Sequence, residues 1–223
     1  MNIFSLRKRS LRVAALLGAA AVLIACNPIE NQSQSATLLI VENMLGTDHL
    51  GNNVNFLESD VVQGETTAPI YVADMAIASL RASSLNPNPN LGVSQYYNIQ
   101  LTRYVVTFFR SDGRNVPGVD VPYGFEGTVS ALIRVGSVVD FPFIIVRQVA
   151  KTEPPLINLR RGYPDEVLSV TAKVDFYGHD LANRNVATTG YLPVNFANYG
   201  DLVDGGGLAV RGLSRNLRQT IPR

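Results

Sequence analysis

The alternation of apolar and polar residues between positions 168 and 177 constrains the fold of this chain more than any other feature of its sequence. Every second residue is apolar, and the apolar set is Leu168, Val170, Ala172, Val174 and Phe176. Successive side chains of a β-strand point to opposite faces, so the pattern predicts a strand over 167–177 with one face in a core and the other in solvent. A polar turn at 178–185 and a second β-rich run at 186–196 follow, which predicts an antiparallel hairpin.

Five further segments are rich in β-branched and aromatic residues and are separated by Gly, Pro, Asn and Asp: 37–42, 70–82, 97–110, 128–135 and 141–150. No segment after Cys26 follows a helical period over three turns. Hydrophobic residues make up 46% of the chain, which supplies enough apolar surface for a core. About seven strands without helical crossovers predict a single all-β domain over 37–200, an antiparallel β-sandwich.

Alternation also predicts which residues form the core. We expect residues 37–197 to be almost wholly β, with one apolar face of the strands buried. The predicted buried residues are Val129, Ile133, Leu168, Val170, Val174, Phe176, Leu192 and Val194. Residues 201–223 contain three consecutive glycines and four arginines, and we expect them to be a disordered tail.

The turn Tyr177-Gly-His-Asp-Leu-Ala-Asn183 resembles the closing hairpin of bacterial immunoglobulin-like and fibronectin-III-like modules. This resemblance implies an immunoglobulin-like sandwich. The chain has no Trp and a single Cys, so it lacks the Trp and the disulfide of antibody domains. As a whole, the sequence resembles uncharacterised predicted lipoproteins of Gram-negative anaerobes, and that resemblance implies no particular activity.

The N-terminus has the pattern of a secretory signal peptide. Residues 1–12 contain four basic residues, and residues 13–25 form an unbroken run of small and apolar residues. Thirteen residues in a helix rise about 20 Å, whereas the hydrocarbon core of a bilayer is about 30 Å thick. The run is therefore too short for a comfortable membrane span, and we predict a signal peptide over 1–25.

The apolar run ends in Leu23-Ile24-Ala25-Cys26, which resembles the lipobox of bacterial lipoproteins. The resemblance implies cleavage before Cys26 and attachment of acyl chains to it, and two or three chains give stable anchoring to a membrane. It also implies a bacterial cell-envelope location. Residues 26–36 are polar and are expected to be a flexible tether. Asn27, in place of the Asp that retains lipoproteins in the inner membrane, favours the outer membrane.

The net charge of +1 hides an uneven distribution. Four basic residues lie within residues 1–12 and no acid precedes Glu30, so the chain without its first 25 residues has 15 basic and 18 acidic residues. That balance argues against nucleic-acid binding, which requires a basic surface. One Cys and two His argue against a disulfide framework and against a Cys- or His-based metal centre.

The sequence supplies few groups for catalysis. A nucleophile requires an adjacent base, and both histidines, His49 and His179, lie in predicted turns. Glycoside hydrolysis requires two carboxylates across a cleft, and Glu58 and Asp60 would share a face of an extended segment. Such acids are more simply explained as solvated loop residues. We predict that the protein is not an enzyme and takes no cofactor, with a catalytic, hydrolytic lipoprotein as the alternative.

Calcium is a second alternative, because Asp180, Asn183 and Asn185 place three oxygen-bearing side chains within six residues. Asp and Asn also form turns by bonding their own backbone, and Arg184 would repel a cation. We therefore favour a plain turn and predict no metal ligands, with a calcium-dependent adhesion module as the alternative.

If consecutive strands alternate in direction, their connections fall at two opposite ends. One set comprises 45–69, 111–124 and 152–166, and the other comprises the Asn86-Pro87 region, the Gly136 turn and the 178–185 turn. The tether enters beside the second set, so we expect the first set to face away from the membrane. Long loops on a rigid scaffold commonly carry binding sites, and Arg and Tyr are enriched at hot spots. The candidate partner-binding residues are Arg114, Tyr123, Arg160, Arg161 and Tyr163.

These observations together predict a membrane-anchored envelope lipoprotein that binds or scaffolds another envelope protein or a polysaccharide. Its contact with the membrane is expected to run through lipid on Cys26.

Overall fold

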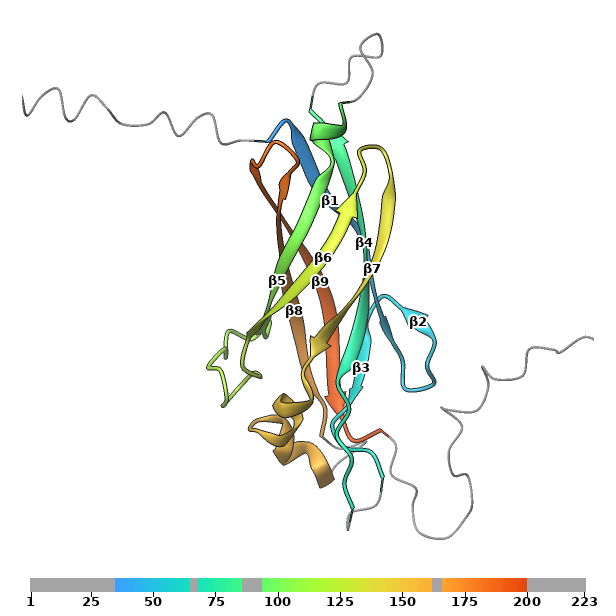
Figure 1. Ribbon diagram of the computed structural model, residues 1–223. Helices are drawn as coiled ribbons and strands as arrows, with labels where there is room; N and C mark the ends of the chain where they lie inside the picture. The colour runs from blue at the N-terminus through green and yellow to red at the C-terminus, as the bar shows by residue number, and fades with distance from the viewer. Residues whose placement is uncertain (1–34, 65–67, 86–93, 162–165, 200–223) are drawn as a thin grey trace, which may run out of the picture. The chain divides into compact units, whose positions relative to one another are not determined.

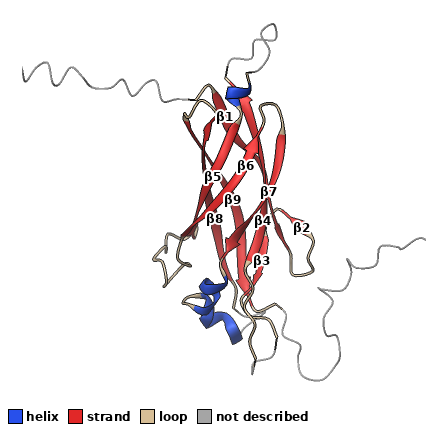
Figure 2. Ribbon diagram, viewed as in Figure 1, coloured by secondary structure: helices blue, strands red, loops and turns tan. Residues whose placement is uncertain are grey.

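The computed structural model describes residues 35–64, 68–85, 94–161 and 166–199, and these residues form two β-sheets packed face to face (Figure 1). The strands are β1 (Thr37–Thr47), β2 (Asn53–Val54), β3 (Leu57–Asp60), β4 (Asp74–Ser84), β5 (Ile99–Phe109), β6 (Phe125–Ile133), β7 (Val138–Val146), β8 (Leu168–Asp180) and β9 (Asn185–Ala197). Three short 3-10 helices accompany them: η2 (Gln95–Tyr97), η3 (Gln148–Thr152) and η4 (Leu156–Arg161). Within the described ranges there is no α-helix (Figure 2).

The strand order is β2-β1-β4-β7 in one sheet and β3-β9-β8-β5-β6 in the other. This arrangement confirms the predicted all-β sandwich. Neighbouring strands are antiparallel except β3, which runs parallel to β9. When the seven longer strands are lettered in chain order, A, B and E share one sheet and C, D, F and G share the other. The fourth strand, β6, has therefore changed sheets relative to the ABED and CFG sheets of an immunoglobulin constant domain.

The predicted hairpin is formed by β8 and β9, whose register runs from Leu168 opposite Phe196 to His179 opposite Asn185. Both strands extend further into the predicted turn than the sequence indicated, so that only residues 181–184 connect them. Asn183 adopts a positive φ of 62° in this turn. Asn tolerates the left-handed conformation well, which explains its use here.

One continuous core fills the space between the sheets, and seven of the eight predicted core residues are buried in it: Ile133, Leu168, Val170, Val174, Phe176, Leu192 and Val194. Val129 differs, because it is only partly buried. It lies on β6, which is the last strand of its sheet and has a neighbour on one side only. Its position in the strand order, which alternation does not reveal, explains the difference.

The connection predicted over 45–69 takes part in both sheets. β1 continues to Thr47, β2 pairs with its end, and β3 then joins the opposite sheet beside β9. Gly46 permits this crossing, because a Cβ there would lie 2.4 Å from the carbonyl oxygen of Phe56. The close approach of two backbone segments requires Gly, which a sequence pattern reads only as a turn signal.

The predicted strand over 141–150 is also revised. β7 begins at Val138 and ends at Val146, and the chain then forms η3 and η4 before β8. Residues 37–197 are therefore less uniformly β than expected, since this connection is built from 3-10 helices.

The connections gather at two ends, as alternating strand directions predict (Figure 1). The end where the chain enters, here called the tether end, comprises residues 35–38, 82–85, 94–99, 132–138 and 179–186. The opposite or distal end comprises residues 47–64, 68–73, 109–125, 146–161 and 166–168, together with 196–199. The Asn86-Pro87 region lies outside the described residues.

Candidate functional site

The distal end contains the described part of every connection that was predicted to face away from the tether. The end of β5 lies beside the start of β8, since Phe109 is opposite Thr171. The end of β7 lies beside the start of β4, since Val146 is opposite Asp74. The loops 110–124 and 147–161 therefore leave the same end of the sandwich, and the predicted geometry is confirmed.

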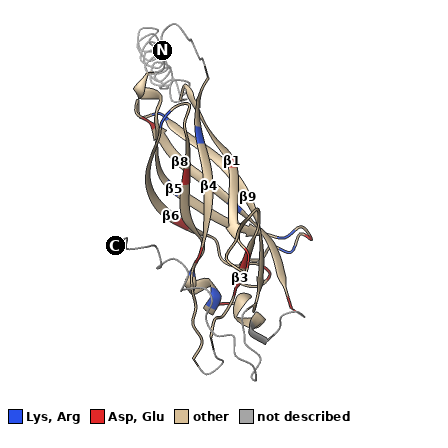
Figure 3. Cartoon of the chain, turned by 90° about the vertical axis from the view of Figure 1, so that its right-hand side faces the viewer, with Lys and Arg blue, Asp and Glu red and all other residues tan. Residues whose placement is uncertain are grey.

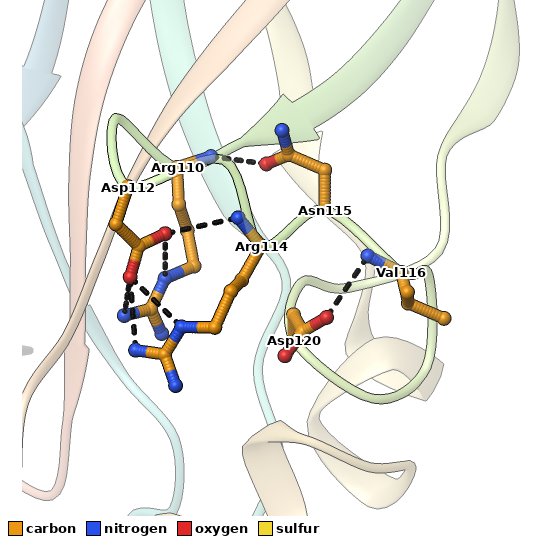
Figure 4. A network of polar contacts seen from close by, with 6 residues as sticks. All are labelled: Arg110, Asp112, Arg114, Asn115, Val116 and Asp120. Atoms are coloured by element: carbon orange, nitrogen blue, oxygen red, sulfur yellow. Dashed lines mark hydrogen bonds and ion pairs between the residues drawn. The ribbon is translucent and has the colours of Figure 1, made fainter.

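A network of charged side chains orders the first half of the 110–124 loop (Figure 4). The Asp112 carboxylate accepts hydrogen bonds from Nε of Arg110 at 3.1 Å and from Nε of Arg114 at 3.0 Å. The second guanidinium nitrogen of each arginine also bonds this carboxylate, at 2.6 and 2.8 Å. Its Oδ1 additionally accepts the backbone N–H of Arg114. One carboxylate thus holds two guanidinium groups side by side, in the fork geometry that arginine favours.

These contacts shift the pKa values of Asp112 and Arg110. Hydrogen bonds from Arg110 and then Arg114 lower the pKa of Asp112 far below its ordinary value. The same contact with Asp112 raises the pKa of Arg110. Both shifts favour the charged forms of Asp112 and Arg110, so this ion pair persists at neutral pH.

Hydrogen bonds donated by backbone N–H groups, to a side chain and to a carbonyl, order the second half of the loop. The N–H of Val116 donates to Oδ2 of Asp120 at 3.1 Å, and the N–H of Gly118 donates to the Val121 carbonyl at 2.8 Å. Gly118 has a φ of 77°, and the ring of Tyr123 packs directly over it. A Cβ on Gly118 would lie 2.2 Å from Oη of Tyr123. Gly is required here both by the left-handed backbone and by the aromatic ring above it.

The ordered loop still exposes apolar surface. Val116 is 56% exposed, Val119 is 67% exposed and Tyr123 is 48% exposed. Arg114 is the more exposed of the two arginines beside them. The loop therefore presents aliphatic, aromatic and cationic groups together on a fixed backbone.

The second distal connection, 147–161, is fastened to the sandwich by a buried ion pair. The Lys151 side chain is fully buried, and its Nζ donates to the Asp60 carbonyl at 2.7 Å and to Oδ1 of Asp74 at 2.9 Å. Ser59 Oγ donates to the other carboxylate oxygen of Asp74 at 2.6 Å. Burial raises the pKa of Asp74, and the charge and hydrogen bonds of Lys151 and Ser59 oppose that rise.

Two further residues predicted to bind a partner lie at the end of this connection. Arg160 and Arg161 are the last residues of η4, and their side chains lie outside what the structure describes. Tyr163 and Cys26 lie outside the described residues altogether. Of the five predicted partner-binding residues, Arg114 and Tyr123 are thus placed on one loop.

The distal carboxylates considered for catalysis have partners. Glu58 contacts the imidazole of His49, and its Oε2 accepts the backbone N–H of His49 at 3.0 Å. Burial alone would raise the pKa of Glu58, but these hydrogen bonds lower it on balance. Asp60 shares a face of β3 with Glu58, as predicted, and accepts the N–H of Tyr199. His49 also stacks on the ring of Tyr199, with centroids 5.8 Å apart.

In the 180–185 turn, the Asp180 side chain accepts hydrogen bonds from the backbone of the turn itself. The buried Asp180 carboxylate accepts the backbone N–H groups of Ala182 and Arg184 at 3.0 and 2.9 Å. It also accepts the Ser35 hydroxyl at 2.7 Å, which ties the turn to the start of the domain. Across the described part of the chain, no three His, Cys, Asp or Glu side chains come together as a metal site.

Sequence reasoning missed the residues that shape the distal end. Val116 and Val119 lie in the connection predicted over 111–124, and Arg110 ends the strand predicted over 97–110, but no local pattern singles them out. Lys151 follows an apolar run, and nothing in its local sequence indicates that it is buried. Their roles depend on which loops meet in space.

No protein-family model and no curated protein matches this chain. In the part that the structure describes, we find no helix of the length and apolar character needed to span a bilayer.

Proposed function

We propose that the protein is a non-catalytic binding or scaffold module of the bacterial cell envelope. Lipid on Cys26 anchors it to a membrane, with the outer membrane favoured by Asn27. The distal end of the sandwich binds another envelope protein or a polysaccharide. The lipobox-like sequence supports the anchor, and the 110–124 loop supports the binding role.

The observation that carries the binding proposal is the combination of order and exposure in this loop. Ion pairs with Asp112 and hydrogen bonds of Val116 and Gly118 fix the backbone, while Val119 and Tyr123 remain exposed. A loop that is already ordered loses little conformational entropy on binding. Exposed apolar groups that gather in one place and are bordered by polar residues commonly mark interaction sites.

The charges of the loop indicate the chemistry of the partner. Arg110 and Arg114 share the carboxylate of Asp112, and Asp120 also acts on Arg110, but the Arg114 side chain remains 64% exposed and available to a partner. Guanidinium groups bind carboxylates and phosphates in a bidentate manner. A partner that presents an acidic group beside an apolar one complements this surface.

The carboxylates at this end support binding over catalysis. Asp112 is engaged by two arginines, Asp120 by the N–H of Val116, and Glu58 by His49. A general acid or base must reach a substrate proton. Groups held in their own loop contacts are poorly placed to do so.

Pull-down from detergent-solubilised membranes, with a parallel sedimentation assay on purified envelope polysaccharide, tests the proposal. The Arg114→Ala/Val119→Ser variant removes an exposed cation and an exposed aliphatic group without touching the core. We expect it to fold like the wild type by far-UV circular dichroism and to lose the bound protein or polysaccharide.

The matched control is Leu132→Ser/Arg134→Ala, which makes the same kinds of change at exposed positions of the tether end. It should retain whatever the wild type binds. Equal retention by both variants would show that the distal loop is not the binding surface.

A further inference from the structure

The tether end exposes large apolar side chains beside the point where the chain enters the domain. Tyr96 is 58% exposed and Leu85 is 57% exposed, and Leu181 in the β8–β9 turn is also exposed. Leu38, at the start of β1, lies on the same end with about half of its surface exposed. These four side chains come from four separate segments of the chain.

Hydrogen bonds hold these segments together at one end of the sandwich. The N–H of Leu85 donates to the Ala36 carbonyl at 2.8 Å, and the N–H of Leu181 donates to the Asn98 carbonyl at 3.0 Å. Thr37 Oγ1 donates to the carbonyl of Tyr97 at 2.9 Å. The apolar side chains are therefore displayed on a connected framework around the first residues of β1.

The exposed charges among the described tether-end residues are of one sign. Arg134 and Arg184 are exposed there. The only acid in the tether-end residues is Asp180, which is buried and accepts hydrogen bonds from Ser35, Ala182 and Arg184. Asp and Glu lie mostly towards the opposite end, as the red segments of Figure 3 show. The described residues of the tether end thus expose basic groups only, whereas those of the distal end expose both acids and bases.

We infer that the tether end rests on the membrane surface, with Leu85, Tyr96 and Leu181 inserted at the level of the lipid headgroups and Arg134 and Arg184 facing anionic phosphates. This inference rests on the proposed lipid anchor at Cys26. Amphipathic surfaces of aliphatic, aromatic and basic residues bind membrane interfaces in this way. Tyrosine is enriched at this depth, because its ring is apolar and its hydroxyl is polar.

The proposed lipid anchor lies close in sequence to the tether end, which favours a membrane as the binding partner of this surface. Eight residues, 27–34, separate the lipidated Cys26 from Ser35, so the two positions are at most about 30 Å apart when the chain is fully extended. The apolar side chains surround the attachment point of that short segment. An anchored domain therefore meets the membrane with this end more readily than with any other part of its surface.

The test uses lipidated protein in vesicles of phosphatidylethanolamine and phosphatidylglycerol. Cys26 is the only cysteine, so once it is acylated an introduced cysteine is the only free thiol. A polarity-sensitive fluorophore is attached at Leu181→Cys, at Tyr96→Cys or at the distal position Val119→Cys. Intact mass confirms lipidation of each sample, which separates failure of the anchor from failure of the contact.

We expect nitroxide-labelled lipids to quench the labels at 181 and 96 several-fold more strongly than the label at 119. Adding Arg134→Ala and Arg184→Ala to Leu181→Cys should reduce quenching at 181, whereas Arg114→Ala should not. Equal, weak lipid quenching at all three positions in lipidated protein would overturn the inference. Shielding of the labels at 181 and 96 from both lipid-borne and aqueous quenchers would also overturn it, since the chain itself would then cover these residues.

Discussion

The Lys151 ammonium group lies 2.9 Å from the carboxylate of Asp74, with no part of the lysine side chain reaching solvent. Lys151 belongs to η3, in the distal connection, and Asp74 begins β4 in the four-stranded sheet. The pair therefore joins the connection between β7 and β8 to the body of the sandwich. Because the pair lies in surroundings of low dielectric constant, either charge would strongly destabilise the fold without the other.

Replacing Lys151 by Met is expected to destabilise the fold by about 3–5 kcal/mol, because the Asp74 charge is left buried without its partner. The Lys151→Met/Asp74→Leu variant should recover much of this loss, since neither charge then remains. Urea unfolding of the wild type, both single variants and the double variant gives the coupling energy. Additive effects of the two single changes would mean that the pair is not coupled.

The Lys151→Met variant should also show an altered pH dependence. Burial raises the pKa of Asp74, and Lys151 is the main group that opposes this rise. Without Lys151 the pKa rises further, so the folded state binds the proton more tightly than the unfolded state does. Stability should then be greatest at or below the ordinary carboxyl pKa and fall as the pH increases through the raised value. Urea midpoints near pH 4 and near pH 7 should differ more for the variant than for the wild type.

Gly118→Ala tests how the distal loop is shaped. The new Cβ would collide with the Tyr123 ring, and the left-handed backbone adds a further penalty. Gly113→Ala is the matched control, because Gly113 has a φ of 81° with open space around it. The control should cost about 1–2 kcal/mol from the backbone alone, and Gly118→Ala should cost more. Tyr123→Ala should relieve the excess, which thermal unfolding of the single and double variants would reveal.

Asp112→Asn should loosen the loop while leaving the sandwich folded. The substitution keeps the size of the side chain and removes the charge that holds Arg110 and Arg114 together. The Arg114 amide, which donates to this carboxylate, should then exchange its hydrogen faster. Hydrogen-exchange mass spectrometry of the 110–124 peptide should show the change, with the β8–β9 peptides as an internal control. Unchanged protection in that peptide would mean that the backbone bonds alone order the loop.

Val174→Asp is expected to abolish folding, because Val174 is fully buried in the sandwich core and an unpaired charge there is strongly unfavourable. Thr171→Asp is the control on the same strand, since Thr171 points to the outer face of the sheet. Circular dichroism should show a β spectrum for the control and a disordered chain for Val174→Asp.

Cys26→Ser should prevent lipidation, because serine lacks the thiol that accepts the diacylglycerol. Intact mass spectrometry of the native protein should show loss of residues 1–25 and a gain of acyl mass, whereas the variant should remain uncleaved or be released without lipid. A native protein with a free thiol at Cys26 and cleavage elsewhere would refute the lipoprotein assignment.

The sequence alone was sufficient to predict the sandwich and most of its core. Alternation is a local property: in β8, Val170, Val174 and Phe176 reach the core because successive side chains of a strand point to opposite faces. The order of loops at the two ends also followed from alternating strand directions. The strand–turn–strand pattern near 178–185 predicted the hairpin, although its turn is shorter than expected.

Tertiary structure decided what depends on contacts between distant segments. Gly46 lies within β1 and not in a loop, and its lack of a side chain lets the backbone at Phe56 pass directly against it. Val129 is only partly covered because β6 ends its sheet. Lys151 is buried because Asp74, far away in the sequence, supplies its counter-charge. Alternation specifies the face of a strand on which a residue lies, and the folded chain alone determines which strand, loop or charge lies opposite that face.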